Sequence, residues 1–136
     1  MTILFPFVPA AGLTSAHRSA LEAIARTVEP VEIAFRRVGR FPTVVYLDPE
    51  PSGPLRTLTD AVVARYPDHL PYGGAFDDVI PHLTVTDDGD APLDLVAAEA
   101  SRWLPFTHHA AALEVLVESP EGRWHRRWRL PLGIRP

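Results

Sequence analysis

The sequence predicts an α+β fold in one domain spanning residues 1–136, with two lobes that each contain a small antiparallel sheet backed by helix. Strand-length runs rich in Val, Ile, Phe and Thr alternate with longer segments whose apolar residues recur at helical spacing. Each half of the chain shows the order strand, helix, strand, strand. A chain of 136 residues with 46% hydrophobic residues is long enough and apolar enough to bury one core.

The first half is predicted to contain two helices among its strands. The first helix begins at Thr14 or Ser15, either of which can cap its N-terminus, and ends near Val28. The second helix covers residues 55–66, where leucine and valine recur in rough helical spacing. Runs dominated by β-branched and aromatic residues predict three strands, over residues 2–8, 31–37 and 43–47.

The second half follows an irregular run over residues 67–81. Asp87 to Asp90 reads as the turn that ends its first strand, and a Pro-Glu-Gly sequence marks a hairpin turn near the C-terminus. The predicted elements are a strand over residues 82–86, a helix over 92–104, and hairpin strands over 110–118 and 123–130.

Composition excludes several classes of protein. The formal net charge of −4 provides no overall basic field for binding nucleic acid, so a phosphate group must be held by local side chains. The absence of cysteine excludes a disulfide framework, a thiolate zinc site and a cysteine nucleophile. No apolar run reaches the roughly 18 residues of a membrane span. We therefore expect a cytoplasmic monomer with neither a membrane nor DNA as partner.

Residues 81–85, which read PHLTV, carry the strongest functional pattern. His82 and Thr84 are two apart on a predicted strand, so their side chains point to the same face. This pairing places an imidazole beside a hydroxyl. One imidazole provides half of an acid–base pair, and a second group is needed to complete it.

Several short stretches occur together in an order that resembles one family. The chain carries TILFPFVP at residues 2–9, YGGAFD at 72–77, PHLTV at 81–85 and a closing hairpin that contains tryptophan. Over nearly its whole length it is similar to the 2H phosphoesterase superfamily, in the branch labelled 2′-5′ RNA ligase or cyclic phosphodiesterase. That resemblance implies two antiparallel sheets lining a central cleft, with helices packed outside, and one His-x-Thr motif in each lobe.

The resemblance also implies roles for individual residues. His82 would be a general acid or base, and Thr84 and Thr2 would donate hydrogen bonds to phosphate oxygens. The family acts without a metal or other cofactor on 2′,3′-cyclic phosphates, related cyclic phosphates and 2′-5′ linkages. The histidine of the first motif would stand immediately before Met1. Either the natural chain begins upstream, or the sequence is truncated, or this histidine has been lost.

Two further residues are candidates for binding a nucleotide or an RNA end. Tyr72 precedes two glycines and could stack on a base or ribose, although a turn in which its ring covers the core is an alternative. Thr86 shares the parity of His82 and Thr84 and is a candidate for lining the cleft.

Other polar clusters have simpler explanations. The RWHRRWR run over residues 123–129 resembles a nucleic-acid patch, but it also fits a solvated sheet face on which Glu114 lies opposite Arg127. Adjacent strand residues such as His108 and His109 point to opposite faces and cannot easily share a metal ion. The acidic run after Thr86 lacks the twelfth-position acid of a calcium loop. We expect no metal site.

Three functions follow from these observations. The first is a metal-independent phosphodiesterase that uses histidine as general acid and base. The second is a relative with impaired catalysis that binds a nucleotide or RNA end without converting it. The third is an interaction module that uses the C-terminal hairpin, for which replacing His82 would leave ligand binding unchanged. No GxGxxG, GxxxxGK[ST] or GxSxG motif supports dinucleotide, P-loop or α/β-hydrolase chemistry.

Overall fold

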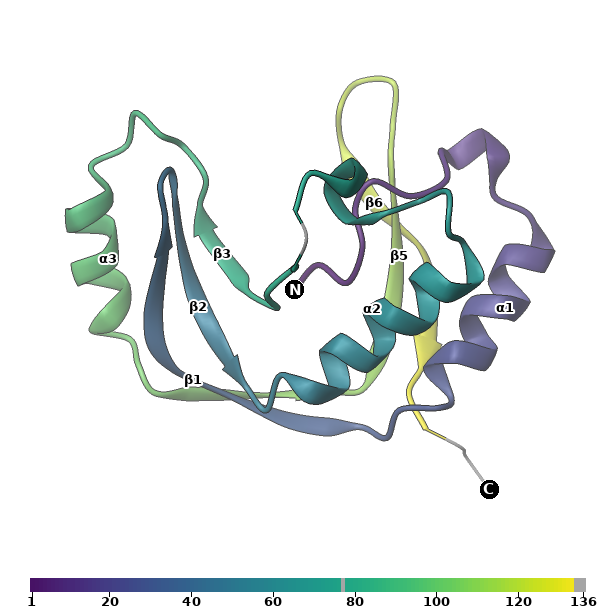
Figure 1. Cartoon of the computed structure of the whole chain (residues 1–136), viewed down its shortest axis with the longest axis horizontal. Coiled ribbons are helices and arrows are strands. Elements are labelled where there is room, and N and C mark those ends of the chain that lie inside the picture. The colour runs from purple at the N-terminus through teal and green to yellow at the C-terminus, as the bar shows by residue number, and fades with distance from the viewer. Residues whose placement is uncertain (77, 134–136) are drawn as a thin grey trace.

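The computed structural model describes residues 1–76 and 78–133, and Figure 1 shows their arrangement. Two short 3₁₀ turns, Ala10–Gly12 and Pro71–Gly74, precede α1 and follow α2. The helices are α1 (Ser15–Ala25), α2 (Gly53–Arg65) and α3 (Leu93–Ser101), close to the predicted positions. The strands are β1 (Val31–Phe41), β2 (Val44–Glu50), β3 (Leu83–Thr86), β4 (Phe106–Ala110), β5 (Ala112–Glu118) and β6 (Trp124–Pro131).

The described strands form two antiparallel sheets, as the sequence predicts. One sheet has four strands in the order β3-β2-β1-β4, and the other is the β5–β6 hairpin. Helix α3 packs against the four-stranded sheet, and α1 and α2 pack together beside the hairpin (Figure 1). The α+β class is confirmed.

The expectation that each sheet collects the strands of one half of the chain is wrong. β3, from the second half, pairs with β2 from the first half. The cause is long-range burial, because Leu83 of β3 packs against the buried cluster that contains Ile33, Phe35 and Leu47. The free edge of β2 thereby gains a partner that is distant in sequence.

The predicted strand over residues 2–8 does not form. The segment bends at residues 3–6 and has no partner strand among the described residues. Pro6 cannot donate a backbone hydrogen bond to a ladder. The segment is tied down by isolated bonds: Thr59 Oγ1 donates to the Ile3 carbonyl at 2.8 Å, and the Tyr72 N–H donates to the Phe5 carbonyl at 2.6 Å.

β4 lies outside the predicted strand ranges except for residue 110, although His108 and His109 are expected to be strand residues. It pairs antiparallel with β1, and Phe106 stacks on Phe35 with ring centroids 4.9 Å apart. Its sequence, FTHHA, lacks alternation between apolar and polar residues. Strand formation here depends on the exposed edge of β1 rather than on burial of one face, since four of the five β4 residues are exposed.

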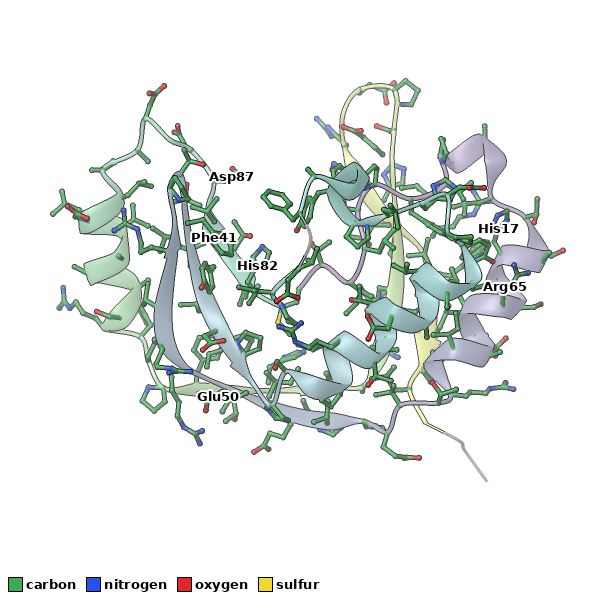
Figure 2. The ribbon with its side chains drawn as sticks, in the orientation of Figure 1. His17, Phe41, Glu50, Arg65, His82 and Asp87 are labelled. Carbon is green, nitrogen blue, oxygen red and sulfur yellow. The ribbon has the colours of Figure 1, made fainter. Side chains whose placement is uncertain are left out.

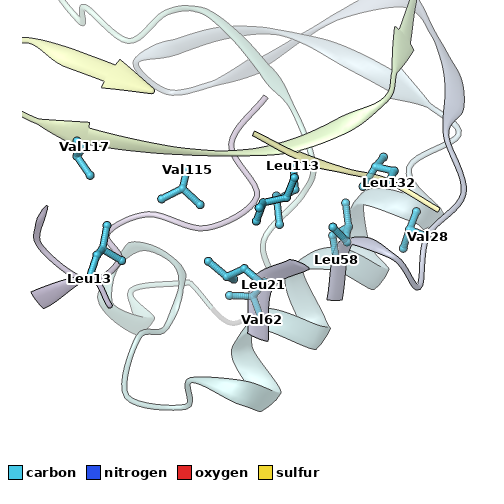
Figure 3. Close-up of a cluster of buried hydrophobic side chains, with 11 residues drawn as sticks. Leu13, Leu21, Val28, Leu58, Val62, Leu113, Val115, Val117 and Leu132 are labelled. Atoms are coloured by element: carbon cyan, nitrogen blue, oxygen red, sulfur yellow. The ribbon is translucent and has the colours of Figure 1, made fainter. Parts of the chain in front are cut away.

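Two hydrophobic clusters hold the fold together. The smaller one contains Ile33, Phe35, Leu47 and Leu55 and lies between the four-stranded sheet and the start of α2. The larger one joins α1 and α2 to the hairpin, as Figure 3 shows. Its buried residues are Leu13, Leu21, Ala25, Val28, Leu58, Val62, Leu113, Val115, Val117, Leu130 and Leu132.

The hairpin forms as predicted, but its register differs. At the turn Glu118 lies opposite Trp124, one position beyond Arg123, and a β-bulge between Val115 and Leu116 adds one more position, so that Glu114 lies opposite Arg129 rather than Arg127. Glu114 forms ion pairs with Arg126 at 3.0 Å and with Arg129 at 3.6 Å. Arg126 and Arg129 thus lie on a solvated face of the sheet and share a carboxylate partner. This favours the simpler explanation of the RWHRRWR run.

Replacing Ile33 with alanine is expected to lower the free energy of unfolding by about 2–5 kcal/mol, because the fully buried side chain leaves a cavity. Replacing Leu116, which is 51% exposed, is expected to change it by no more than about 0.5 kcal/mol. Urea unfolding followed by circular dichroism measures both values. Equal losses for the two variants would contradict this assignment of the core.

Candidate functional site

His82 lies immediately before β3 and is half-buried. Its Nδ1 atom is 2.6 Å from the backbone carbonyl oxygen of Ile80. A carbonyl oxygen can only accept a hydrogen bond, so Nδ1 must carry the proton. The opposite ring nitrogen, Nε2, is therefore the atom of the neutral imidazole that can accept a proton.

An aromatic pair holds the imidazole of His82 from one side. The rings of Phe41 and Tyr46 stack with centroids 4.5 Å apart. Both lie edge-on to His82, at 5.5 Å and 5.6 Å respectively. The Tyr46 ring lies over Gly39, where a Cβ atom would collide with it. Figure 2 shows Phe41 and His82 near the middle of the molecule.

A cavity of about 390 Å³ brings His82 together with Thr2. Its walls come from the N-terminal segment, from α2 and from residues 70–82. Among the described residues, none of β5 or β6 lines this cavity, where α2 forms one wall. The β5–β6 hairpin lines a larger hollow of about 1130 Å³ that also reaches Met1 and Thr2. His82 and Thr2, which come from the two ends of the family pattern, thus line the same smaller cavity.

Thr84 and Thr86 lie beside this cavity rather than among its described lining residues. Thr84 is exposed and lies opposite Tyr46, so its side chain shares a sheet face with the ring that contacts His82. The Thr86 hydroxyl accepts a hydrogen bond from the Asp88 N–H at 3.3 Å. That hydroxyl therefore helps to close the turn after β3.

Tyr72 occupies a strained turn. Its φ of 52° lies in the left-handed region, which non-glycine residues rarely adopt. Burial raises the pKa of its phenol above the ordinary value. The ring packs edge-on against Phe76 with centroids 5.8 Å apart. Of these two aromatic residues, Phe76 lines the cavity and is 62% exposed. Asp77, the last residue of the YGGAFD stretch, lies outside the described residues.

Three charged residues that line the cavity, Arg56, Asp60 and Asp78, were missed by sequence reasoning. Arg56, in the first turn of α2, lines the cavity and forms an ion pair with Asp78 at 3.1 Å. Asp78 also lines the cavity. Arginine on an amphipathic helix ordinarily indicates a solvated face, so the sequence carried no signal that would have identified Arg56.

Two kinds of feature are absent from the part of the chain that the structure describes. In residues 1–76 and 78–133, no group of three or more His, Asp or Glu side chains is arranged to hold a metal ion. None of the helices described by the structure has the length and apolar character required to cross a membrane.

Comparisons with known proteins agree with this fold. The crystal structure of TT0787 of Thermus thermophilus superposes with a TM-score of 0.62 at 20% sequence identity, covering 95% of this chain and 75% of that one. At this identity the likeness concerns the fold alone. A search of curated proteins gives no match. The family model described as the 2′-5′ RNA ligase superfamily matches residues 1–121. The chain belongs to the 2′-5′ RNA ligase superfamily.

Proposed function

We propose that this protein is a metal-independent phosphodiesterase that acts on 2′,3′-cyclic phosphates or on 2′-5′-linked nucleotides and RNA ends. The observation that carries the proposal is the cavity that His82 and Thr2 share, although they come from opposite ends of the family pattern. The size of the cavity, about 390 Å³, falls in the range of small-molecule sites. Membership of a family that typically comprises enzymes supports the same class of reaction.

His82 is proposed to transfer the proton through Nε2. The hydrogen bond from Nδ1 to the Ile80 carbonyl selects the required tautomer and restrains rotation of the ring. The edges of Phe41 and Tyr46 restrain the ring further. In the neutral form, Nε2 would accept a proton from the attacking water or hydroxyl; in the protonated form, it would donate one to the leaving oxygen.

Thr2 and Thr84 are proposed to hold the phosphate. A hydroxyl can donate one hydrogen bond, and donors directed at non-bridging oxygens stabilise the charge that develops in the transition state. Thr2 is exposed at the cavity, and Thr84 lies one strand position beyond Leu83 on the face of Tyr46. Tyr72 and Thr86 are proposed as more distant contacts to the nucleotide, with Phe76 nearer to the opening.

A second candidate function is binding of a nucleotide or RNA end without turnover. The observation that favours it is that His82 is the single imidazole among the described residues lining the cavity. A mechanism that needs both an acid and a base would then take its second group from a side chain other than histidine, such as Asp60 or Asp78 of the same cavity, or from solvent.

The proposed function is tested by comparing substrates. The protein is expected to hydrolyse 2′,3′-cyclic nucleotides, and EDTA is expected to leave the rate unchanged because no step uses a metal. A 3′,5′-cyclic nucleotide serves as the matched substrate. Product release is followed by liquid chromatography. Loss of activity in EDTA that returns on addition of a divalent cation would refute the metal-independent mechanism.

A further inference from the structure

The cavity that contains His82 and Thr2 has few positive charges for a site that would bind phosphate. Arg56 is the only arginine among its described lining residues, and the chain contains no lysine. Asp60 and Asp78 line the same cavity. One guanidinium against two carboxylates gives these side chains a formal charge of −1 when His82 is neutral. A phosphate that enters would meet this excess of negative charge.

Arg56 is paired at the cavity with a solvent-exposed carboxylate. Its Nη1 atom is 3.1 Å from Asp78 Oδ1, and the two side chains are 43% and 73% exposed. Exposed ion pairs of this kind contribute little net stability. A phosphate group offers a guanidinium the same geometry of paired oxygens and more negative charge. A phosphate group can therefore compete with the Asp78 carboxylate for Arg56.

The two partners of the ion pair differ in how their backbone is anchored. Arg56 lies between Leu55, which is buried in the smaller hydrophobic cluster, and Thr57, one residue before Leu58 of the larger cluster. Helix α2 is thus anchored to both cores, and the guanidinium has a fixed base. Asp78 lies in the irregular segment between the 3₁₀ turn and β3. Arg56 is thus the partner with the better anchored backbone.

We infer that Arg56 is a phosphate-binding residue. The Asp78 carboxylate is paired with the Arg56 guanidinium until a phosphate displaces the carboxylate. This inference rests on the proposed function and adds to it the cation that the His-x-Thr motif does not supply. Binding brings the guanidinium, the Thr2 hydroxyl and the His82 imidazole around one phosphate. Asp78 then acts as an internal competitor whose removal strengthens binding of the anion.

Binding of inorganic phosphate and of adenosine 2′-monophosphate, measured by calorimetry, tests the inference. Arg56→Ala is expected to weaken both about 10- to 100-fold, the loss typical of a charged hydrogen bond. Arg56→Lys is expected to retain part of the affinity, because the charge remains while the planar fork is lost. Asp78→Asn is expected to tighten binding severalfold, because it frees Arg56 and removes a negative charge from the cavity.

Arg40→Ala is the matched control. Arg40 also forms a long-range ion pair, with Asp94 at 2.9 Å, and its side chain is 40% exposed, but it lies outside the lining of the cavity. The variant has the same net charge as Arg56→Ala and is expected to bind phosphate as the unchanged protein does. Thermal unfolding of every variant confirms that it is folded.

The outcomes separate this inference from the proposed function. If the unchanged protein binds adenosine 2′-monophosphate and Arg56→Ala binds it equally well, the inference is overturned while the proposed function stands. Weakening by Asp78→Asn would overturn the role of Asp78 as a competitor. If the unchanged protein neither binds phosphate nor hydrolyses a cyclic nucleotide, the proposed function fails and the inference fails with it.

Discussion

Replacing His82 with glutamine is expected to lower kcat/KM for a 2′,3′-cyclic nucleotide by about 10²–10⁴-fold, the contribution of one positioned acid–base group. Glutamine retains hydrogen-bonding capacity and similar length, but its amide cannot exchange a proton near neutral pH. The environment of the ring, with the Ile80 carbonyl on Nδ1 and two aromatic edges around it, supports a role in proton transfer rather than in surface solvation.

The control for this prediction is His125→Gln. His125 is exposed on β6 and lies outside the lining of the cavity. Steady-state hydrolysis by the two variants and the unchanged protein gives kcat and KM separately. A kcat loss with little change in KM fits an acid–base role, because such a group acts in the transition state. Equal activity of His82→Gln and His125→Gln would remove His82 from the mechanism.

Placing a histidine directly before Met1 is expected to raise the rate of cyclic-phosphate hydrolysis by about 10²-fold or more. The family pattern assigns the first motif's histidine to this position, with Thr2 two residues later. Met1 and Thr2 both line the cavity that contains His82, so a residue placed before Met1 adjoins the same cavity. Two imidazoles could then divide the roles of base and acid.

The matched control carries alanine before Met1 and is expected to show no gain. Combining the added histidine with His82→Gln is expected to abolish the increase, because the two groups act as a unit. The assay is hydrolysis of a 2′,3′-cyclic nucleotide, with nucleotide binding measured in parallel. Binding in all forms without any gain in hydrolysis would favour the second candidate function.

The local sequence was sufficient for most of the secondary structure. Helices α1, α2 and α3 and the β5–β6 hairpin lie close to their predicted positions because amphipathic spacing and turn residues act over short distances. The segment over residues 2–8 shows the limit of this reasoning. Its composition favours a strand, but Pro6 removes a donor and the observed bonds to Thr59 and Tyr72 are single contacts rather than a ladder.

Some residues of the candidate site could likewise be predicted from the sequence, and others could be found only in the structure. The His-x-Thr spacing identified His82 and Thr84, and the resemblance of residues 2–9 to the family identified Thr2, because both patterns are local. The sequence could not reveal Arg56, which looks like an ordinary helix arginine until α2 is placed against the cavity. The sequence likewise could not show which of Tyr72 and Phe76 lines the cavity. In the structure, Phe76 lines it and Tyr72 lies in the turn at residues 71–74.

Periodicity and short motifs were enough to establish the α+β class, the helices, the hairpin and the resemblance to a 2H phosphoesterase. Each of these depends on residues that are close together in the sequence. Long-range packing was needed to join β3 to β2, to turn FTHHA into β4, and to bring Arg56 and Asp78 together beside Thr2 and His82. The physical reason is that strand edges and charged groups find partners through burial and proximity in space. Those partners lie far apart along the chain, where no local pattern records them.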